Sequence, residues 1–121
     1  VERTCLETDA LSYAASDVKP DEGSRFIIED GVCKLADHSS LAGSIATMDV
    51  LVRTMVQKAN VPLADAVRMA SETPARLKGV SDRTGTLQRG KDADIIILDR
   101  NLTVRAVWSM GNLVTAANTL Y

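Results

Sequence analysis

Apolar positions in residues 45–59 recur at spacings of three and four, the pattern of a helix with one apolar face. Ser44 precedes this run and is a candidate N-cap, because its hydroxyl can accept a bond from a free backbone N–H of the first turn. The same spacing continues after Pro62 and predicts a second helix over residues 63–71. The apolar face of the first helix consists of Ile45, Met48, Leu51, Val52, Met55, Val56 and Ala59.

A third, short helix is predicted between Thr73-Pro74 and Gly79. Threonine followed by proline is typical of an N-cap with proline in the first turn, and glycine is the usual residue just after a helix. Residues 12–24 are small and polar and predict a loop. Residues 1–8 have the character of a strand that runs into a loop.

Two β-prone runs, residues 26–29 and 32–35, flank Asp30-Gly31 and predict a hairpin with a type I′ turn, whose two central residues need positive φ. The run Ala93 to Leu98 is rich in β-branched residues and too short for a helix, which predicts a buried strand. Residues 103–108 are a further β-prone run. A turn at residues 110–113 and a last short strand from Val114 complete the predicted elements.

The composition narrows the class of protein. The 121 residues suffice for one modest core, and a net charge of −2 without a basic patch argues against a nucleic acid partner. No apolar run approaches the roughly 20 residues of a membrane span, so we expect no membrane association. Cys5 and Cys33 fit no close metal spacing and are typical of reduced thiols in a cytoplasmic protein.

Two residues are candidates for chemistry. Asp9 follows a short predicted strand and opens a loop, which is where α/β enzymes place catalytic groups, although an ordinary loop or capping aspartate has the same pattern. His38 lies in a polar run between Asp37 and Ser39. It has no partner at ligand spacing, which favours an exposed loop position over a metal ligand or a base.

Several short phrases carry a resemblance to a known superfamily. Residues 73–77 (Thr-Pro-Ala-Arg-Leu), Gly79, residues 85–87 (Gly-Thr-Leu) and residues 90–94 (Gly-Lys-Asp-Ala-Asp) together resemble the C-terminal part of the amidohydrolase superfamily. The resemblance implies a metal-dependent hydrolase. It also implies a (β/α)8 barrel with a small β domain built from both ends of the chain.

A second pair of segments resembles one family within it. Residues 6–11, read with Leu41-Ala42-Gly43-Ser44 and Thr47-Met48, resemble the N-acetylglucosamine-6-phosphate deacetylases. The resemblance implies that Asp9, at the end of the eighth barrel strand, is the catalytic acid/base beside the metal. It implies that Leu41, Ala42 and Gly43 contact the substrate, an amino sugar phosphate. It further implies a homo-oligomer in the full-length form.

The implied metal, zinc or iron, is held in that family by a glutamate and two histidines from earlier barrel strands, which have no counterpart here. A (β/α)8 barrel needs about 250 residues. We therefore expect an α/β chain with the last strand and helices of an incomplete barrel in residues 1–80 and part of the small β domain in residues 81–121. A self-contained α+β module is the alternative.

The expected function is that of the C-terminal portion of a metal-dependent deacetylase. It hydrolyses the acetamide of N-acetylglucosamine-6-phosphate to glucosamine-6-phosphate and acetate, and this portion alone is expected to be inactive. Two alternatives stay open. The first is that the chain is part of another amidohydrolase, such as a deaminase or cyclic amidase. The second is that it is a non-catalytic interaction module.

Overall fold

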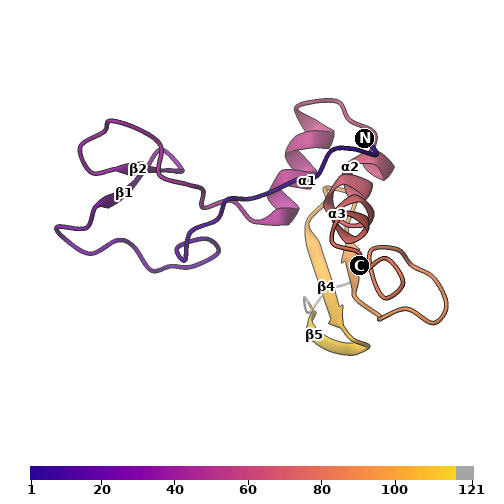
Figure 1. The fold of residues 1–121 in the computed structure, drawn as a ribbon. Helices are drawn as coiled ribbons and strands as arrows, with labels where there is room; N and C mark the ends of the chain where they lie inside the picture. The colour runs from indigo at the N-terminus through magenta and orange to yellow at the C-terminus, as the bar shows by residue number, and fades with distance from the viewer. Residues whose placement is uncertain (117–121) are drawn as a thin grey trace. The chain divides into compact units, whose positions relative to one another are not determined.

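The computed structural model describes residues 1–116, and Figure 1 shows its elements along the chain. Two compact units are present, one of residues 7–51 and one of residues 1–6 with residues 52–116. The predicted division after residue 80 concerns the complete enzyme and stays a prediction; residues 117–121 lie outside the described residues. The elements are β1 (Phe26–Glu29), β2 (Val32–Leu35), α1 (Met48–Gln57), α2 (Leu63–Ala70), α3 (Glu72–Leu77), β3 (Ile95–Leu98), β4 (Val104–Ser109) and β5 (Asn112–Ala116).

The predicted hairpin is confirmed. Strands β1 and β2 pair antiparallel, with Glu29 opposite Val32 at the turn. Asp30 and Gly31 have φ of 53° and 75°, as a type I′ turn requires. Cys33 of β2 is fully buried.

Helix α1 begins three residues later than the sequence pattern predicts, and the predicted cap is wrong. Leu51 N–H donates to the carbonyl of Thr47, so Thr47, not Ser44, precedes the first turn. Ser44 is engaged elsewhere: its hydroxyl accepts a bond from Ala46 N–H at 2.9 Å. At the other end, the chain leaves the helix before Asn60, which has a φ of 55°.

Helices α2 and α3 follow one another almost directly. Arg68 of α2 contacts Asp65 at 3.0 Å and Glu72 at 3.2 Å, which joins the two helices on their solvent side. The predicted N-cap Thr73 is wrong, because α3 already begins at Glu72 and Thr73 is buried within it. The predicted stop at Gly79 is confirmed by its φ of 71°.

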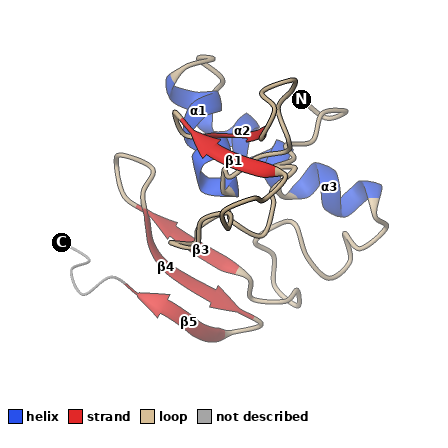
Figure 2. Cartoon of the chain, turned by 90° about the vertical axis from the view of Figure 1, so that its left-hand side faces the viewer, coloured by secondary structure: helices blue, strands red, loops and turns tan. Residues whose placement is uncertain are grey.

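Strands β3, β4 and β5 form one antiparallel sheet in that order, as Figure 2 shows. The turn between β4 and β5 has only two residues, Met110 and Gly111, both with positive φ. Strand β5 therefore begins at Asn112, inside the predicted turn. Ala106 of β4 is fully buried and belongs to the core of this unit together with Val52, Ala66, Met69, Ala75 and Leu102.

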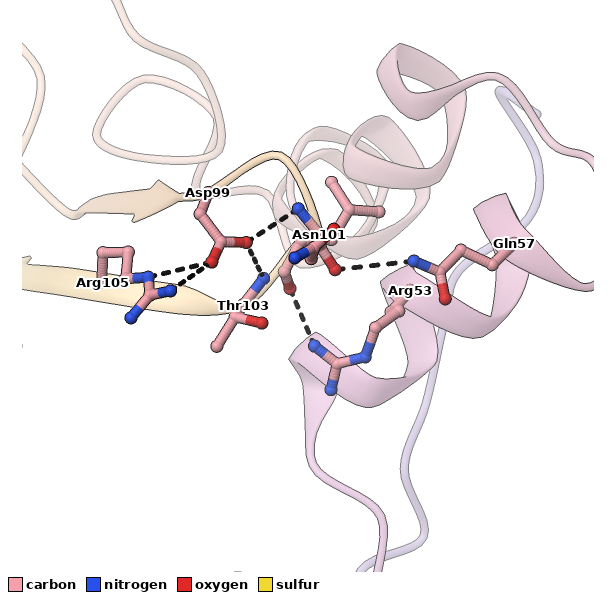
Figure 3. Close-up of polar contacts among 7 residues, drawn as sticks. Arg53, Gln57, Asp99, Asn101, Thr103 and Arg105 are labelled. Atoms are coloured by element: carbon pink, nitrogen blue, oxygen red, sulfur yellow. Dashed lines mark hydrogen bonds and ion pairs between the residues drawn. The ribbon is translucent and has the colours of Figure 1, made fainter. Parts of the chain in front are cut away.

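The turn between β3 and β4 is organised by one carboxylate (Figure 3). Asp99 accepts bonds from the N–H groups of Asn101 at 2.8 Å and Thr103 at 2.9 Å, and from Arg105 at 2.6 Å. These bonds hold the pKa of Asp99 below its ordinary value, and the bond from the Thr103 N–H has the largest effect. Asp99 therefore acts as a structural anchor of the turn.

The same turn is tied to helix α1. Arg53 donates to the carbonyl of Leu102 at 2.8 Å, and Gln57 donates to the carbonyl of Asn101 at 3.5 Å (Figure 3). Leu102 is buried and has a left-handed φ of 62°. Two side chains of α1 thus satisfy carbonyl groups that the sheet leaves free.

The expected last barrel strand is not formed as a strand. A parallel strand needs a neighbour for its N–H and C=O groups, and Leu6 N–H instead donates to the carbonyl of Met69 at 2.9 Å. The pairing reduces to one parallel bridge between Ala10 and Ser44. Residues 1–116 are thus mixed α/β without a closed barrel, and none of their helices is long and apolar enough to cross a membrane.

Candidate active site

Asp9 is held by its backbone while its side chain is exposed. Its φ of 47° is left-handed, a conformation that aspartate adopts more readily than most residues. The hydroxyl of Thr8 accepts a bond from Ala10 N–H at 3.3 Å and spans the turn at Asp9. Within residues 1–116 the Asp9 carboxylate has no hydrogen-bond partner, so both of its oxygens are available to a water or a ligand.

The segment around Ser44 pairs with the Asp9 turn. Ser44 N–H donates to the carbonyl of Asp9 at 2.8 Å, and Leu11 N–H donates to the carbonyl of Ser44 at 2.8 Å. These two bonds form the parallel bridge opposite Ala10. They join parts of the chain that are far apart in the sequence.

The other end of this segment pairs with the hairpin. Ala42 N–H donates to the carbonyl of Cys33 at 3.0 Å, and Leu35 N–H donates to the carbonyl of Ser40 at 3.0 Å. Residues 40–44 therefore connect strand β2 to Asp9. The structure thus brings all the sequence-predicted site residues, Asp9 and the segment Leu41–Gly43, into one place within the unit of residues 7–51.

The segment itself combines an exposed side chain with a close backbone approach. Leu41 is 70% exposed, so its side chain is available for contact. Gly43 has a φ of 83°, and a Cβ at this position would lie 3.1 Å from the Asp9 carbonyl oxygen. Only glycine fits here without moving the backbone of its neighbour.

A cleft of about 480 Å³ lies beside the segment. Its lining, drawn from the described residues, contains no charged side chain. Such a wall suits the apolar part of a small ligand and offers no cationic side chain to a phosphate group. The lining residues are Gly31, Val32, Cys33, Leu41, Gly43, Ser44, Ile45, Ala46 and Val50.

The donor groups of the described residues do not make a metal centre. No three histidine, cysteine or acidic side chains among residues 1–116 converge on one point. His38 is exposed in its loop, with Nδ1 3.7 Å from an oxygen of Glu29. In the same loop the Ser39 hydroxyl, and after it the Ser39 N–H, hold the pKa of Asp37 below its ordinary value. That metal ligands come from another part of the enzyme stays a prediction.

Sequence reasoning missed Leu11 and misassigned Ser44. The pattern makes Ser44 a helix cap, whereas its backbone N–H and C=O groups join Asp9 and Leu11. No local signal predicts this pairing, because a parallel bridge depends on which distant segments meet. Leu11 is part of the same contact, and its side chain lies against Gly43.

Comparison with known proteins gives one consistent family. Residues 6–114 match the model of the Amidohydrolase family. The chain is 38% identical over 119 residues to a putative N-acetylgalactosamine-6-phosphate deacetylase of Escherichia coli K12, covering 94% of this chain and 69% of that protein.

Solved structures agree in fold. N-acetylglucosamine-6-phosphate deacetylase from Pasteurella multocida superposes with a TM-score of 0.86 at 27% identity, over 96% of this chain and 31% of that one. An aspartate-to-alanine variant of the Mycobacterium smegmatis enzyme, in complex with N-acetyl-D-glucosamine-6-phosphate, gives 0.81 at 33% identity over 95% and 31%. This chain therefore spans about a third of each solved enzyme. On the family match and these relatives, the chain belongs to the amidohydrolase family.

Proposed function

We propose that this chain is the C-terminal portion of a metal-dependent N-acetylglucosamine-6-phosphate deacetylase. The observation that carries the proposal is the pairing of the exposed Asp9 with the segment Leu41–Gly43 through the two backbone bonds of Ser44. Relatives with this family's fold are named as deacetylases of N-acetylated hexosamine 6-phosphates, and one was solved with such a ligand.

Asp9 is proposed to move the proton in both halves of the reaction. Its carboxylate takes a proton from the attacking water as the water oxygen bonds to the acetyl carbonyl carbon. The carboxylic acid then gives that proton to the amide nitrogen as the C–N bond breaks, and acetate and the free amine leave. General acid–base catalysis of this kind is typically worth about 10²–10⁴ in rate.

The metal typical of this family would supply electrophilic activation of the water and the carbonyl group when it is bound. The donors of the described residues do not hold it, so its ligands are assigned to the remainder of the enzyme. What this chain contributes is the carboxylate and the surface beside it. The exposed Leu41 and the uncharged cleft suit the acetyl group and the sugar ring, and the phosphate is assigned to other segments.

A second candidate substrate is N-acetylgalactosamine-6-phosphate. It is favoured by the relative from Escherichia coli K12, which carries that name and is 38% identical to this chain. The two sugars differ in the orientation of a single ring hydroxyl. The preferred substrate of the complete enzyme is therefore the one with the higher kcat/KM when both are measured side by side.

The experiment that tests the proposal is steady-state kinetics of the complete enzyme and its Asp9→Asn variant at matched metal occupancy. Asparagine keeps the size and shape of the side chain but cannot hold and return a proton. We expect kcat to fall by at least about 10²–10⁴ while KM changes little. Asp17→Asn, the same chemical change at an exposed position of the loop after Asp9, is the matched control and should retain full turnover.

Two outcomes would contradict the proposal. Similar turnover of wild type and Asp9→Asn would make Asp9 an ordinary loop aspartate. Absence of acetate release from both acetylated sugar phosphates by the complete enzyme would favour one of the alternatives, and release of ammonia from an amino-substituted substrate would identify a deaminase.

A further inference from the structure

The Asp9 turn is fixed by three hydrogen bonds, none of which uses the Asp9 carboxylate. They run from Ala10 N–H to the Thr8 hydroxyl, from Ser44 N–H to the Asp9 carbonyl, and from Leu11 N–H to the Ser44 carbonyl. The position of the carboxylate therefore depends on the position of the Asp9 carbonyl. Whatever lies against that carbonyl controls the geometry of the group proposed to transfer the proton.

Gly43 is the residue that lies against it. A Cβ built on Gly43 would be 3.1 Å from the Asp9 carbonyl oxygen, 3.1 Å from Leu11 Cγ and 3.3 Å from Leu11 Cδ2. The Leu11 atoms belong to a side chain that can rotate away. The carbonyl oxygen belongs to a backbone that Ser44 holds, so it moves only together with Asp9.

We propose that Gly43 is a positioning residue for Asp9: its bare Cα surface and the adjacent Ser44 N–H together seat the Asp9 carbonyl. The proposal rests on the proposed function in one respect, namely that Asp9 carries the proton. Gly43 is already expected to contact the substrate. The positioning role is distinct from that contact and acts on kcat through Asp9.

The chain offers a matched control for the test. Gly23 has a φ of 84°, close to the 83° of Gly43, and a Cβ built there meets nothing within 4 Å. Gly23→Ala and Gly43→Ala therefore both place alanine at nearly the same positive φ, and only Gly43→Ala presses on Asp9. In the complete enzyme we expect Gly43→Ala to lower kcat by about 10- to 100-fold, the size of effect that a small misplacement of a catalytic group produces. A change in KM would report the substrate contact expected of Gly43 and is measured separately from the fall in kcat, and Gly23→Ala should retain wild-type kinetics.

A double variant separates the carbonyl from the leucine. Adding Leu11→Ala to Gly43→Ala removes two of the three close contacts and leaves only the one with the Asp9 carbonyl. The double variant thus lacks the two contacts with Leu11 that would crowd Gly43→Ala. We expect kcat of the double variant to stay low. Recovery of kcat would show that the effect runs through Leu11 and would overturn the proposal, as would an increase in KM at unchanged kcat.

Amide hydrogen exchange provides a readout that does not require activity. The amides of Ser44 and Leu11 donate the bonds that hold the Asp9 turn, so both should exchange faster in Gly43→Ala than in wild type or Gly23→Ala. Amides of β4 should be unchanged in all three. If the wild-type enzyme has no deacetylase activity, the proposed function is wrong, but the positioning role is still tested by hydrogen exchange. Unchanged exchange at Ser44 and Leu11 in Gly43→Ala would overturn the positioning role.

Discussion

At the residue scale, the candidate site depends on two of the several left-handed positions in the unit of residues 7–51. Asp9 and Gly43 both have positive φ, and they face each other across one carbonyl group. Strained positions of this kind persist where the surroundings hold them, and they are frequent at active sites. At Asp9 the surrounding bonds come from its neighbour Thr8 and from Ser44 in a distant segment, so two parts of the chain together hold the turn that carries the proposed catalytic carboxylate.

Gly31 allows the cost of such a position to be measured without steric contact. Its φ is 75°, and a Cβ built on it meets nothing within 4 Å, so a substitution there changes only the backbone energy. We predict that Gly31→Val lowers the free energy of unfolding by about 1–3 kcal/mol, because valine tolerates positive φ poorly. The measurement is the urea midpoint of the complete enzyme.

Gly31→Asn is the control for that measurement. Asparagine visits the left-handed region more readily than valine, so its loss should be clearly smaller. Equal losses for valine and asparagine, or no loss for valine, would mean that the turn does not depend on positive φ at residue 31.

At the scale of elements, the sequence predicts what local physics decides. The hairpin follows from Asp30-Gly31 between two β-prone runs, and the stop of α3 follows from Gly79, since each signal lies within a few residues of the element it controls. The start of α1 and the strand before Asp9 were mispredicted. Ser44 pairs with Asp9 and Leu11 instead of capping α1, and Leu6 N–H donates to Met69 instead of to a neighbouring strand; periodicity reports neither of these distant contacts.

The stretch after Gly79 shows the same limit. Residues 85–87 (Gly-Thr-Leu), which belong to the superfamily resemblance, form an irregular bend without a strand, and polar contacts hold it. Lys91 donates to the Thr86 hydroxyl at 2.6 Å and to the Ser81 carbonyl at 2.5 Å. Side-chain hydrogen bonds that hold a loop thus account for the residue types in this motif. A hydrophobic pattern does not predict such bonds.

Gly85 connects this loop to helix α3 and supports a further prediction. A Cβ on Gly85 would lie 2.6 Å from the Cβ of Ala75, whereas a Cβ on Gly90 meets nothing, and both glycines have a φ of 91°. Gly85→Ala and Gly90→Ala therefore share the same strain and differ only in contact. We predict that Gly85→Ala loses about 1–3 kcal/mol more stability than Gly90→Ala, the usual cost of overpacking.

The comparison of these two variants is made by urea unfolding of the complete enzyme under identical conditions. If both alanine variants have the same midpoint, the loop moves away from α3 at no cost. In that case the close approach of Gly85 to Ala75 is not what requires glycine in this motif.

At the scale of the whole molecule, the described residues leave much apolar surface uncovered. Leu77 and Leu87 are 78% and 79% exposed, and Ile96 of β3 and Val114 of β5 are 59% and 64% exposed. Soluble proteins rarely leave this much large apolar surface open unless something covers it. Since the chain spans 31% of the solved deacetylases it matches, we expect the remainder of the enzyme to cover these side chains.

The final prediction is that the purified 121-residue chain has no deacetylase activity of its own. Zinc is held in catalytic sites by at least three protein ligands that converge on the metal, and the described residues bring no such group together. Asp9 can accept and return a proton, but without a bound metal no activated water is present to donate one. Acetate release from N-acetylglucosamine-6-phosphate should therefore stay at background with added zinc or iron, while the complete enzyme is active under the same conditions. Metal-dependent acetate release by the isolated chain would place the metal ligands within these residues and would require a different assignment of the active site.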